Sequence, residues 1–116
     1  IYGCDDCQLV CPWNKFARAA SHPTLAQLRN SLDTATLIDL FAWSAEDFDL
    51  RMRGSAIRRI GHERWLRNIA VALGNGPADD DAKAALRARA NDESALVREH
   101  VAWALARLTE PRAAAD

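Results

Sequence analysis

Three cysteines lie within the first twelve residues, and their spacing constrains how the start of the chain can fold. Cys4, Cys7 and Cys11 form the pattern Cys-x2-Cys-x3-Cys-Pro. Thiolate sulfurs are soft ligands that suit iron and sulfide, and two thiols three residues apart can reach neighbouring irons across one tight turn. The spacing therefore indicates ligands of a [4Fe–4S] cluster.

The cysteine pattern matches part of the run C-x2-C-x2-C-x3-C-P found in bacterial ferredoxins. Ile1 stands where the first cysteine of that run would be, and the sequence does not begin with methionine. We therefore expect the chain to be the tail of a longer protein, with further cysteines upstream. In two-cluster ferredoxins the fourth cysteine ligates the other cluster, which would assign Cys4 and Cys7 to one cluster and Cys11 to its neighbour.

Two other uses of these thiols remain open. A zinc site would need a fourth ligand such as His22, but its distance in sequence from Cys11 follows no common zinc spacing. A disulfide would leave one of the three thiols unpaired, and the absence of a signal peptide suggests a reducing cytoplasm. The spacing favours the cluster over both alternatives.

Composition indicates an ordinary globular protein. The chain has 116 residues, of which 49% are hydrophobic and 27% charged, so we expect one modest core with an N-terminal appendage. No apolar run approaches the ~20 residues that a membrane-spanning helix needs. The sequence therefore predicts a soluble protein.

The spacing of apolar residues predicts an all-α fold of five to seven helices without significant sheet. The clearest stripe begins after Glu63 and ends at the breakers Gly74-Asn75-Gly76-Pro77. Its apolar members are Trp65, Leu66, Ile69, Ala70, Ala72 and Leu73. Further helices are predicted over about 78–90, with Asp79, Asp80 and Asp81 as N-terminal charges, and from Leu96 to Leu108 before Pro111.

Shorter helices are predicted before this region. Pro23 can start one that runs to about Leu32, Thr36 can cap one that runs to Phe41, and Ser44 can cap a third. Gly54 and Gly61 bracket a piece too short for an independent helix. We expect that piece to form a turn or a single helical turn that presents Arg58 and Arg59.

The net charge of −1 conceals segregated charge. Six arginines against the single acid Glu63 lie between Arg51 and Arg67, which gives that stretch about +5. Such an excess binds phosphates through bidentate contacts and counterion release. The alternative is a solvated helical face whose arginines pair with nearby carboxylates.

The last two predicted helices resemble a HEAT-like repeat. Asp92 precedes Val97-Arg98 by five residues, and Ala102 and Ala104 follow. The predicted organisation is a ferredoxin-like cysteine segment at 1–20, a helical linker region at 21–54 and a HEAT-like helical repeat domain at 55–116.

Three blocks of sequence together resemble the C-terminal part of the epoxyqueuosine reductase family. They are Tyr2-Gly-Cys-Asp-Asp-Cys-Gln-Leu-Val-Cys-Pro-Trp-Asn14, Gly54-Ser-Ala-Ile-Arg-Arg-Ile-Gly61 and Arg64-Trp-Leu-Arg-Asn-Ile-Ala-Val-Ala-Leu-Gly-Asn75. The resemblance implies a cytoplasmic iron–sulfur and cobalamin enzyme that reduces the epoxide of epoxyqueuosine in a tRNA anticodon, the last step of queuosine synthesis. It implies two [4Fe–4S] clusters, an electron donor that remains unknown and a monomer.

The resemblance also assigns roles to residues. Cys4 and Cys7 would ligate the second cluster and Cys11 the first, while Asp5 would lie on the cobalamin side or serve only as a turn residue. Trp13 and Phe16 would shield the clusters from water. The proposed contacts to the anticodon stem-loop are Arg53, Arg58, Arg59 and Arg64. Trp65 and Trp103 are expected in the core rather than as base-stacking platforms.

No catalytic residue is expected within this chain, because the family's proton donor lies upstream. The isolated chain is therefore predicted to be inactive and to hold no cluster stably. The alternative is a ferredoxin-like electron-transfer domain fused to helical repeats that bind a protein partner. A zinc-stabilised adaptor is a third possibility.

Overall fold

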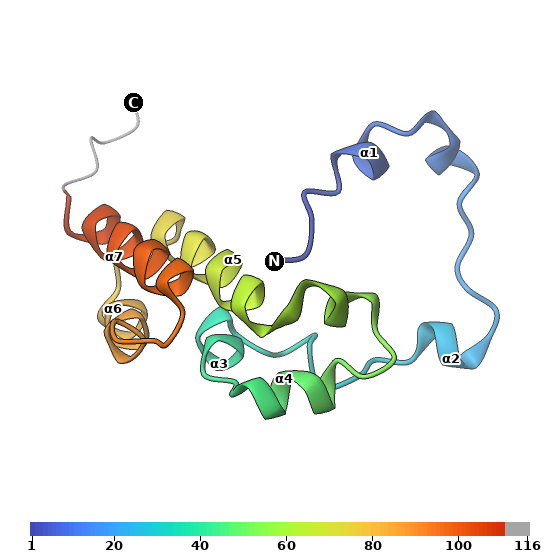
Figure 1. The fold of residues 1–116 in the computed structure, drawn as a ribbon. Coiled ribbons are helices and arrows are strands. Elements are labelled where there is room, and N and C mark those ends of the chain that lie inside the picture. The colour runs from blue at the N-terminus through green and yellow to red at the C-terminus, as the bar shows by residue number, and fades with distance from the viewer. Residues whose placement is uncertain (111–116) are drawn as a thin grey trace. The chain divides into compact units, whose positions relative to one another are not determined.

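The structure is a computed structural model that describes residues 1–110. These residues contain seven α-helices, two 3-10 helices and no strand (Figure 1). The helices are α1 (Asp6–Leu9), η1 (Pro12–Phe16), α2 (Pro23–Ala26), α3 (Leu37–Phe41), α4 (Ala45–Arg51), η2 (Ala56–Ile60), α5 (Gly61–Asn75), α6 (Asp80–Ala88) and α7 (Ala95–Thr109). The all-α prediction is confirmed for the described residues. The predicted end of the fold at Pro111 lies outside them.

Packing divides the chain into two units. One unit is Gly3–Thr34, and the other joins Ile1–Tyr2 to the residues from Ala35 onward. We call the second the helical unit. The predicted bounds at 1–20, 21–54 and 55–116 stay predictions, as do the ferredoxin-like and HEAT-like assignments.

The core of the helical unit lies between α3, α4, α5, α6 and α7. The predicted stripe of α5 is confirmed, because Trp65, Leu66 and Ile69 are all buried. Further buried side chains come from α6 and α7, namely Ala82, Leu86, Val97, Val101, Ala104 and Leu108. Together they form one continuous apolar cluster.

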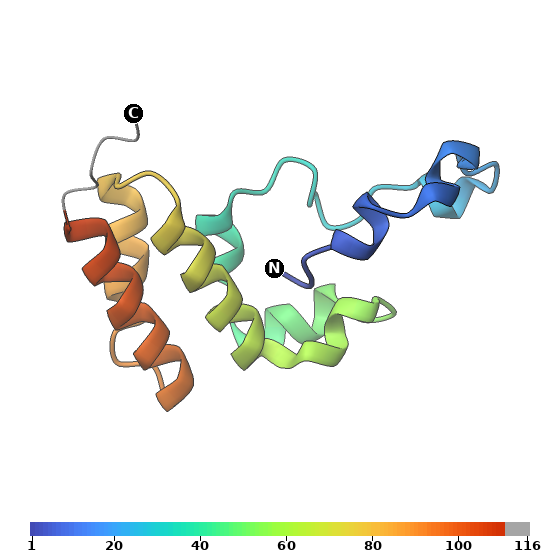
Figure 2. The same ribbon diagram turned by 90° about the horizontal axis from the view of Figure 1, so that it is seen from above.

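Helices α5 and α7 lie side by side and run in the same direction (Figure 1 and Figure 2). At the start of both helices, Ser94 Oγ donates to Glu63 at 2.6 Å. Near their ends, a Cβ added to Gly74 would lie only 2.9 Å from Cα of Ala104. Glycine at position 74 therefore allows the close approach of the two helices.

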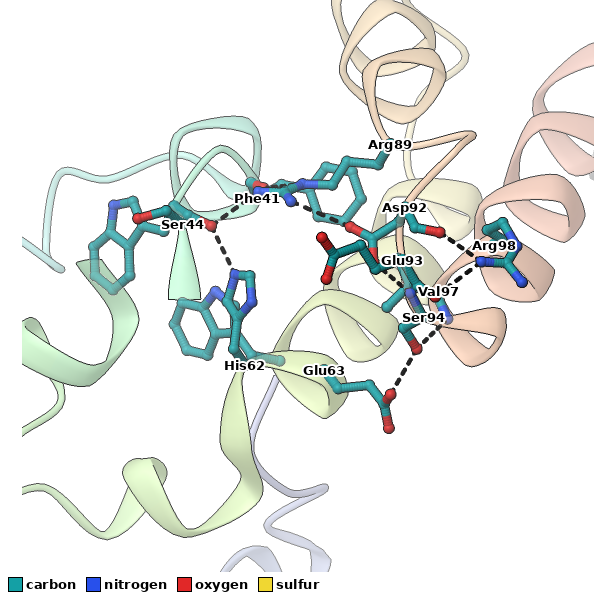
Figure 3. Close-up of polar contacts among 12 residues, drawn as sticks. Phe41, Ser44, His62, Glu63, Arg89, Asp92, Glu93, Ser94, Val97 and Arg98 are labelled. Carbon is teal, nitrogen blue, oxygen red and sulfur yellow. Dashed lines mark hydrogen bonds and ion pairs between the residues drawn. The ribbon is translucent and has the colours of Figure 1, made fainter. Parts of the chain in front are cut away.

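The C-terminal end of α3 is held by side chains from α5 and α6. Trp65 Nε1 donates to the carbonyl of Leu40 at 3.1 Å, and Arg89 Nε donates to that of Phe41 at 3.1 Å. The carbonyl of Trp43 accepts from Arg89 Nη2 at 2.8 Å and from His62 Nε2 at 2.7 Å (Figure 3). The carbonyls of Leu40 and Phe41 belong to the group that a helix end leaves without helical partners, and Trp43 lies in the turn that follows α3.

Arg89 also pairs with Asp92, at 3.3 Å between Nη1 and Oδ2. The two side chains are only 21% and 16% exposed, so this ion pair is largely shielded from water. The Arg89 guanidinium lies 5.7 Å from the ring centroid of Phe41. Arg89 therefore joins α6, the end of α3 and the turn before α7.

The predicted helix starts at Thr36 and Ser44 are confirmed as capping boxes. The Thr36 side chain accepts from the N–H of Asp39, and the Asp39 carboxylate accepts from the N–H of Thr36. Ser44 and Asp47 make the same reciprocal pair. Because the backbone N–H of each capping residue donates to the carboxylate, the pKa of Asp39 and the pKa of Asp47 fall below the ordinary value of 3.8.

The predicted helix from Pro23 is wrong in its extent, since α2 ends at Ala26 and not at Leu32. Leu25 and Leu28 are 76% and 70% exposed and have no core beneath them. A helix this short needs tertiary packing to persist, and this segment receives none within its own unit.

The prediction that both Trp65 and Trp103 are core residues is half wrong. Trp65 is buried, but Trp103 is 41% exposed. The buried stripe of α7 passes through Val101 and Ala104. Successive helical residues turn by about 100°, which places Trp103 at the edge of the stripe.

We expect Arg89→Ala to lower the free energy of unfolding by about 3 kcal/mol or more, because it removes the donor to the Phe41 carbonyl, one of the two donors to the Trp43 carbonyl and the cation that pairs with the shielded Asp92. Arg89→Lys should recover only part of this stability, since one ammonium cannot reach all three acceptors. Urea unfolding measures the stability of both variants. Arg87→Ala, on the exposed face of the same helix, is the control and should stay within about 0.5 kcal/mol of the parent. An Arg89→Ala variant as stable as that control would contradict this role.

The two capping boxes predict a pH dependence. Since the folded pKa of each carboxyl lies below its unfolded value, the stabilisation is present above about pH 4 and disappears as pH falls through the folded pKa. The double variant Asp39→Asn/Asp47→Asn should be less stable at neutral pH and should lose less stability on acidification. Thermal unfolding between pH 2 and 7 tests this, and parallel curves for parent and variant would contradict it.

Candidate nucleic-acid interface and cysteine segment

The arginine-rich stretch forms the end of α4, the 3-10 helix η2 and the start of α5. Gly54 and Gly61 have φ of 78° and 76°, so both occupy the left-handed region that glycine tolerates, and they bracket η2. The side chain of Ser55 accepts from the N–H of Ile57 at 3.2 Å and caps η2. The predicted single helical turn is confirmed.

A surface hollow opens at this turn. It is lined by Gly54, Ser55, Ala56, Arg58 and Arg59. None of these lining residues is acidic, and both arginines are exposed. The hollow therefore offers guanidinium donors beside a small side chain and bare backbone, a surface suited to an anion.

Asp49 on α4 supplies a countercharge to this hollow. Arg58 donates from Nε to Asp49 Oδ1 at 2.8 Å, and its Nη2 lies 2.6 Å from the same oxygen. Arg53 Nη2 lies 3.9 Å from Asp49 Oδ2. All three side chains are about half exposed or more, so water screens these pairs.

The four predicted arginines are therefore not equivalent. The expected alternative of pairing with carboxylates holds for Arg53 and Arg58. Arg59 and Arg64 are exposed, and within residues 1–110 neither side chain makes an ion pair or a hydrogen bond. These two cations are available to a ligand without loss of an internal partner.

The three cysteines lie on and around α1. Cys4 and Cys7 are exposed, Cys11 is partly buried, and none forms a disulfide. In the described part of the chain, no three histidine, cysteine or acidic side chains gather closely enough to hold a metal ion. The donor chemistry suits iron and sulfide, whereas the three thiols alone do not form a closed site.

Asp5 stands at the start of α1 with φ of 59°. Its backbone carbonyl accepts from the N–H groups of Gln8 and Leu9, but its side chain makes no capping bond. The carboxylate is thus exposed beside Cys4. His22, the zinc ligand of the alternative, instead caps α2 by accepting from the N–H of Thr24 at 3.3 Å.

The unit Gly3–Thr34 has no buried side chain. Trp13 and Phe16 are 74% and 62% exposed, and their ring centroids lie 5.7 Å apart. Leu9 and Val10 are also exposed. This unit is therefore held by local hydrogen bonds and not by an apolar core.

Several known proteins with similar sequences share one name. The chain is 63% identical to an epoxyqueuosine reductase of Xanthomonas campestris pv. campestris over 91% of its length. It is 62% identical to that of Burkholderia pseudomallei over 90% of its length, and 54% identical to that of Escherichia coli over 97%. The chain matches a segment of epoxyqueuosine reductases. The resemblance stated from the sequence is thereby confirmed.

The chain spans about 30% of the length of these epoxyqueuosine reductases. Their name identifies them as oxidoreductases. No family model matches the chain, and no solved structure matches it either. Among the described residues, no helix combines the length and apolar character needed to cross a membrane.

Proposed function

We propose that this chain is the part of an epoxyqueuosine reductase that supplies iron–sulfur ligands and a helical surface for tRNA. The whole protein would reduce epoxyqueuosine to queuosine in the anticodon, in the cytoplasm and as a monomer. The observation that carries the proposal is the identity of 54–63% to proteins of that name, over more than nine-tenths of this chain. With no catalytic residue of its own, this chain would be inactive in isolation.

The cysteine segment would hold the clusters. Cys4 and Cys7 would bind one [4Fe–4S] cluster through their thiolates, and Cys11 would bind its neighbour. When bound, the clusters and cobalamin supply the electron transfer and the reducing chemistry. Trp13 and Phe16 would exclude water from the sulfurs, which adjusts the reduction potential. Asp5, exposed beside Cys4, would face the corrin.

The arginine segment would position the anticodon stem-loop. Guanidinium groups bind phosphate through paired N–H donors, and such contacts fix register without reading sequence. Arg59 and Arg64 have no partner to leave among residues 1–110, so they would bind phosphate directly. Arg53 and Arg58 would exchange Asp49 for phosphate. The free-energy cost would be small because these ion pairs are solvent-exposed.

The double variant Arg58→Ala/Arg59→Ala should bind tRNA about tenfold more weakly near 100 mM salt. It should also reduce the slope of log affinity against log salt by about 1.5, since two phosphate contacts are lost. Titration of the intact protein with tRNA over a range of salt concentrations measures both. Asp49→Asn should have the opposite effect on affinity, because it removes the countercharge from the same turn.

Arg87→Ala is the matched control for these variants. It removes an exposed cation from α6, away from the hollow, and should leave both affinity and slope unchanged. An unchanged affinity and slope for the double arginine variant would reject the RNA interface. That result would favour helices that bind a protein partner.

The intact protein, purified without oxygen, should contain about eight irons and no stoichiometric zinc. Cys4→Ser and Cys7→Ser should each lower the iron content and the visible absorbance, because serine is a poor ligand for a cluster iron. Ser21→Ala, in the same unit, is the control and should retain full iron. A parent protein that holds zinc, or no metal at all, would overturn the cluster assignment.

A further inference from the structure

Trp103 is placed unlike the tryptophans of the helical core. Trp43 and Trp65 are buried and stack on each other at 5.4 Å between centroids, whereas Trp103 stays exposed on α7. One edge of its ring is nevertheless packed. The ring edge at Cζ3 lies against α5, only 2.8 Å from where a Cβ on Gly74 would stand. An exposed aromatic ring packed along one edge loses less side-chain freedom when it binds a ligand.

Polar side chains lie beside the ring of Trp103. The guanidinium of Arg107 lies 5.6 Å from its centroid, and Arg107 Nη2 donates to Asn75 Oδ1 at 3.4 Å. His100 Nδ1 lies 2.8 Å from the carbonyl of Leu96, so Nδ1 donates and a neutral ring keeps Nε2 as an acceptor. A surface hollow beside the ring is lined by Val71, Glu99, His100 and Trp103.

Val71, which lines the hollow, lies on the same face of α5 as Arg64. Residues 64, 68, 71 and 75 recur at spacings of three and four, which places them on one side of the helix. Seven residues separate Arg64 from Val71, a rise of about 10 Å along the axis. The Ile1 carbonyl accepts from Asn68 on this face. Arg64 and Trp103 therefore lie on the same side of the α5–α7 pair.

We propose that Trp103 is a stacking platform for an unpaired base of the bound RNA. The inference rests on the proposed function, and it extends the interface from phosphate contacts at Arg59 and Arg64 to a base contact. Single-stranded nucleic acid is bound by exposed aromatic rings beside cations, because every base has a π face. Arg107 supplies the cation, while His100 and Glu99 can meet the polar edge of a base.

A protein partner fits this site less well. Protein hot spots combine aromatic anchors with an apolar surround that excludes water. Here the ring is bordered by Glu99, His100 and Arg107, and Val71 is the only other apolar residue lining the hollow. The lining thus has the composition of a base site rather than of a protein docking groove.

The test compares a synthetic anticodon stem-loop with the same stem closed as an uninterrupted duplex, each titrated into the intact protein. Trp103→Ala should weaken stem-loop binding about 5- to 100-fold and leave duplex binding unchanged. Trp103→Phe should stay within about threefold of the parent. Trp103→Leu retains apolar bulk without a π face and should be as weak as alanine.

The slope of log affinity against log salt separates this proposal from the arginine interface. It should not change in the Trp103 variants, because no phosphate contact is lost. Leu50→Ala, which removes an exposed apolar side chain from α4, is the control and should bind like the parent. Far-UV circular dichroism and urea unfolding identify any variant that fails to fold.

Each remaining outcome decides between proposals. If Trp103→Leu binds the stem-loop like the parent, the stacking platform is rejected. It is also rejected if every Trp103 variant binds like the parent while Arg58→Ala/Arg59→Ala binds more weakly, and the phosphate interface then stands. If the parent binds neither RNA, the proposed function fails with it. Equal loss of stem-loop and duplex binding in folded Trp103 variants would also reject a base contact.

Discussion

The carbonyl groups at the end of α3 connect most of the helical unit. A helix of five residues does not persist in water by itself, so α3 depends on the donors that Trp65 and Arg89 bring to its last two carbonyls, while His62 and Arg89 hold the Trp43 carbonyl just beyond it. The same bonds fix the direction in which the chain leaves α3 and enters α4. The short helices are therefore ordered by the long ones.

Arg89 carries this connection onward to α7. Its partner Asp92 accepts from the N–H of Ser94 through Oδ1, and the Asp92 backbone carbonyl accepts from Arg98 at 2.6 Å. Ser94 caps α7 and also donates to Glu63 on α5 (Figure 3). One polar network thus links α3, α5, α6 and α7. The arginine turn at η2 leads directly into α5, which this network holds, so the proposed phosphate contacts stand on an ordered scaffold.

Local rules predicted the parts of this fold that depend on neighbouring residues. The α5 stripe and the caps at Thr36 and Ser44 follow from residues three or four positions apart. The bonds from Arg89 to the carbonyls of Phe41 and Trp43 span 48 and 46 residues and leave no local pattern. The only sequence signal near Arg89 was Asp92, which marked the HEAT-like pair without revealing its partner.

The candidate interface was predictable to a similar degree. Counting charges located the arginine segment. The pair of Arg53 with Asp49 is four residues apart and therefore local, but the pairing of Arg58 with Asp49 depends on the path of the chain through Gly54. Trp103 was misplaced because one residue along a helix decides between the buried stripe and its edge. The cysteine spacing predicted ligands, but among the described residues no three such side chains converge on one point.

The two units obtain their stability in different ways. The helical unit buries a continuous apolar core, whereas the unit Gly3–Thr34 leaves Leu9, Val10, Trp13 and Phe16 exposed. A segment of about thirty residues is too short to bury a sufficient core by itself. Metal–thiolate bonds can take the place of a core, because the free energy of ligand binding then becomes free energy of folding. Under the proposed function, the cysteines are therefore both the cluster ligands and the principal source of order in that unit.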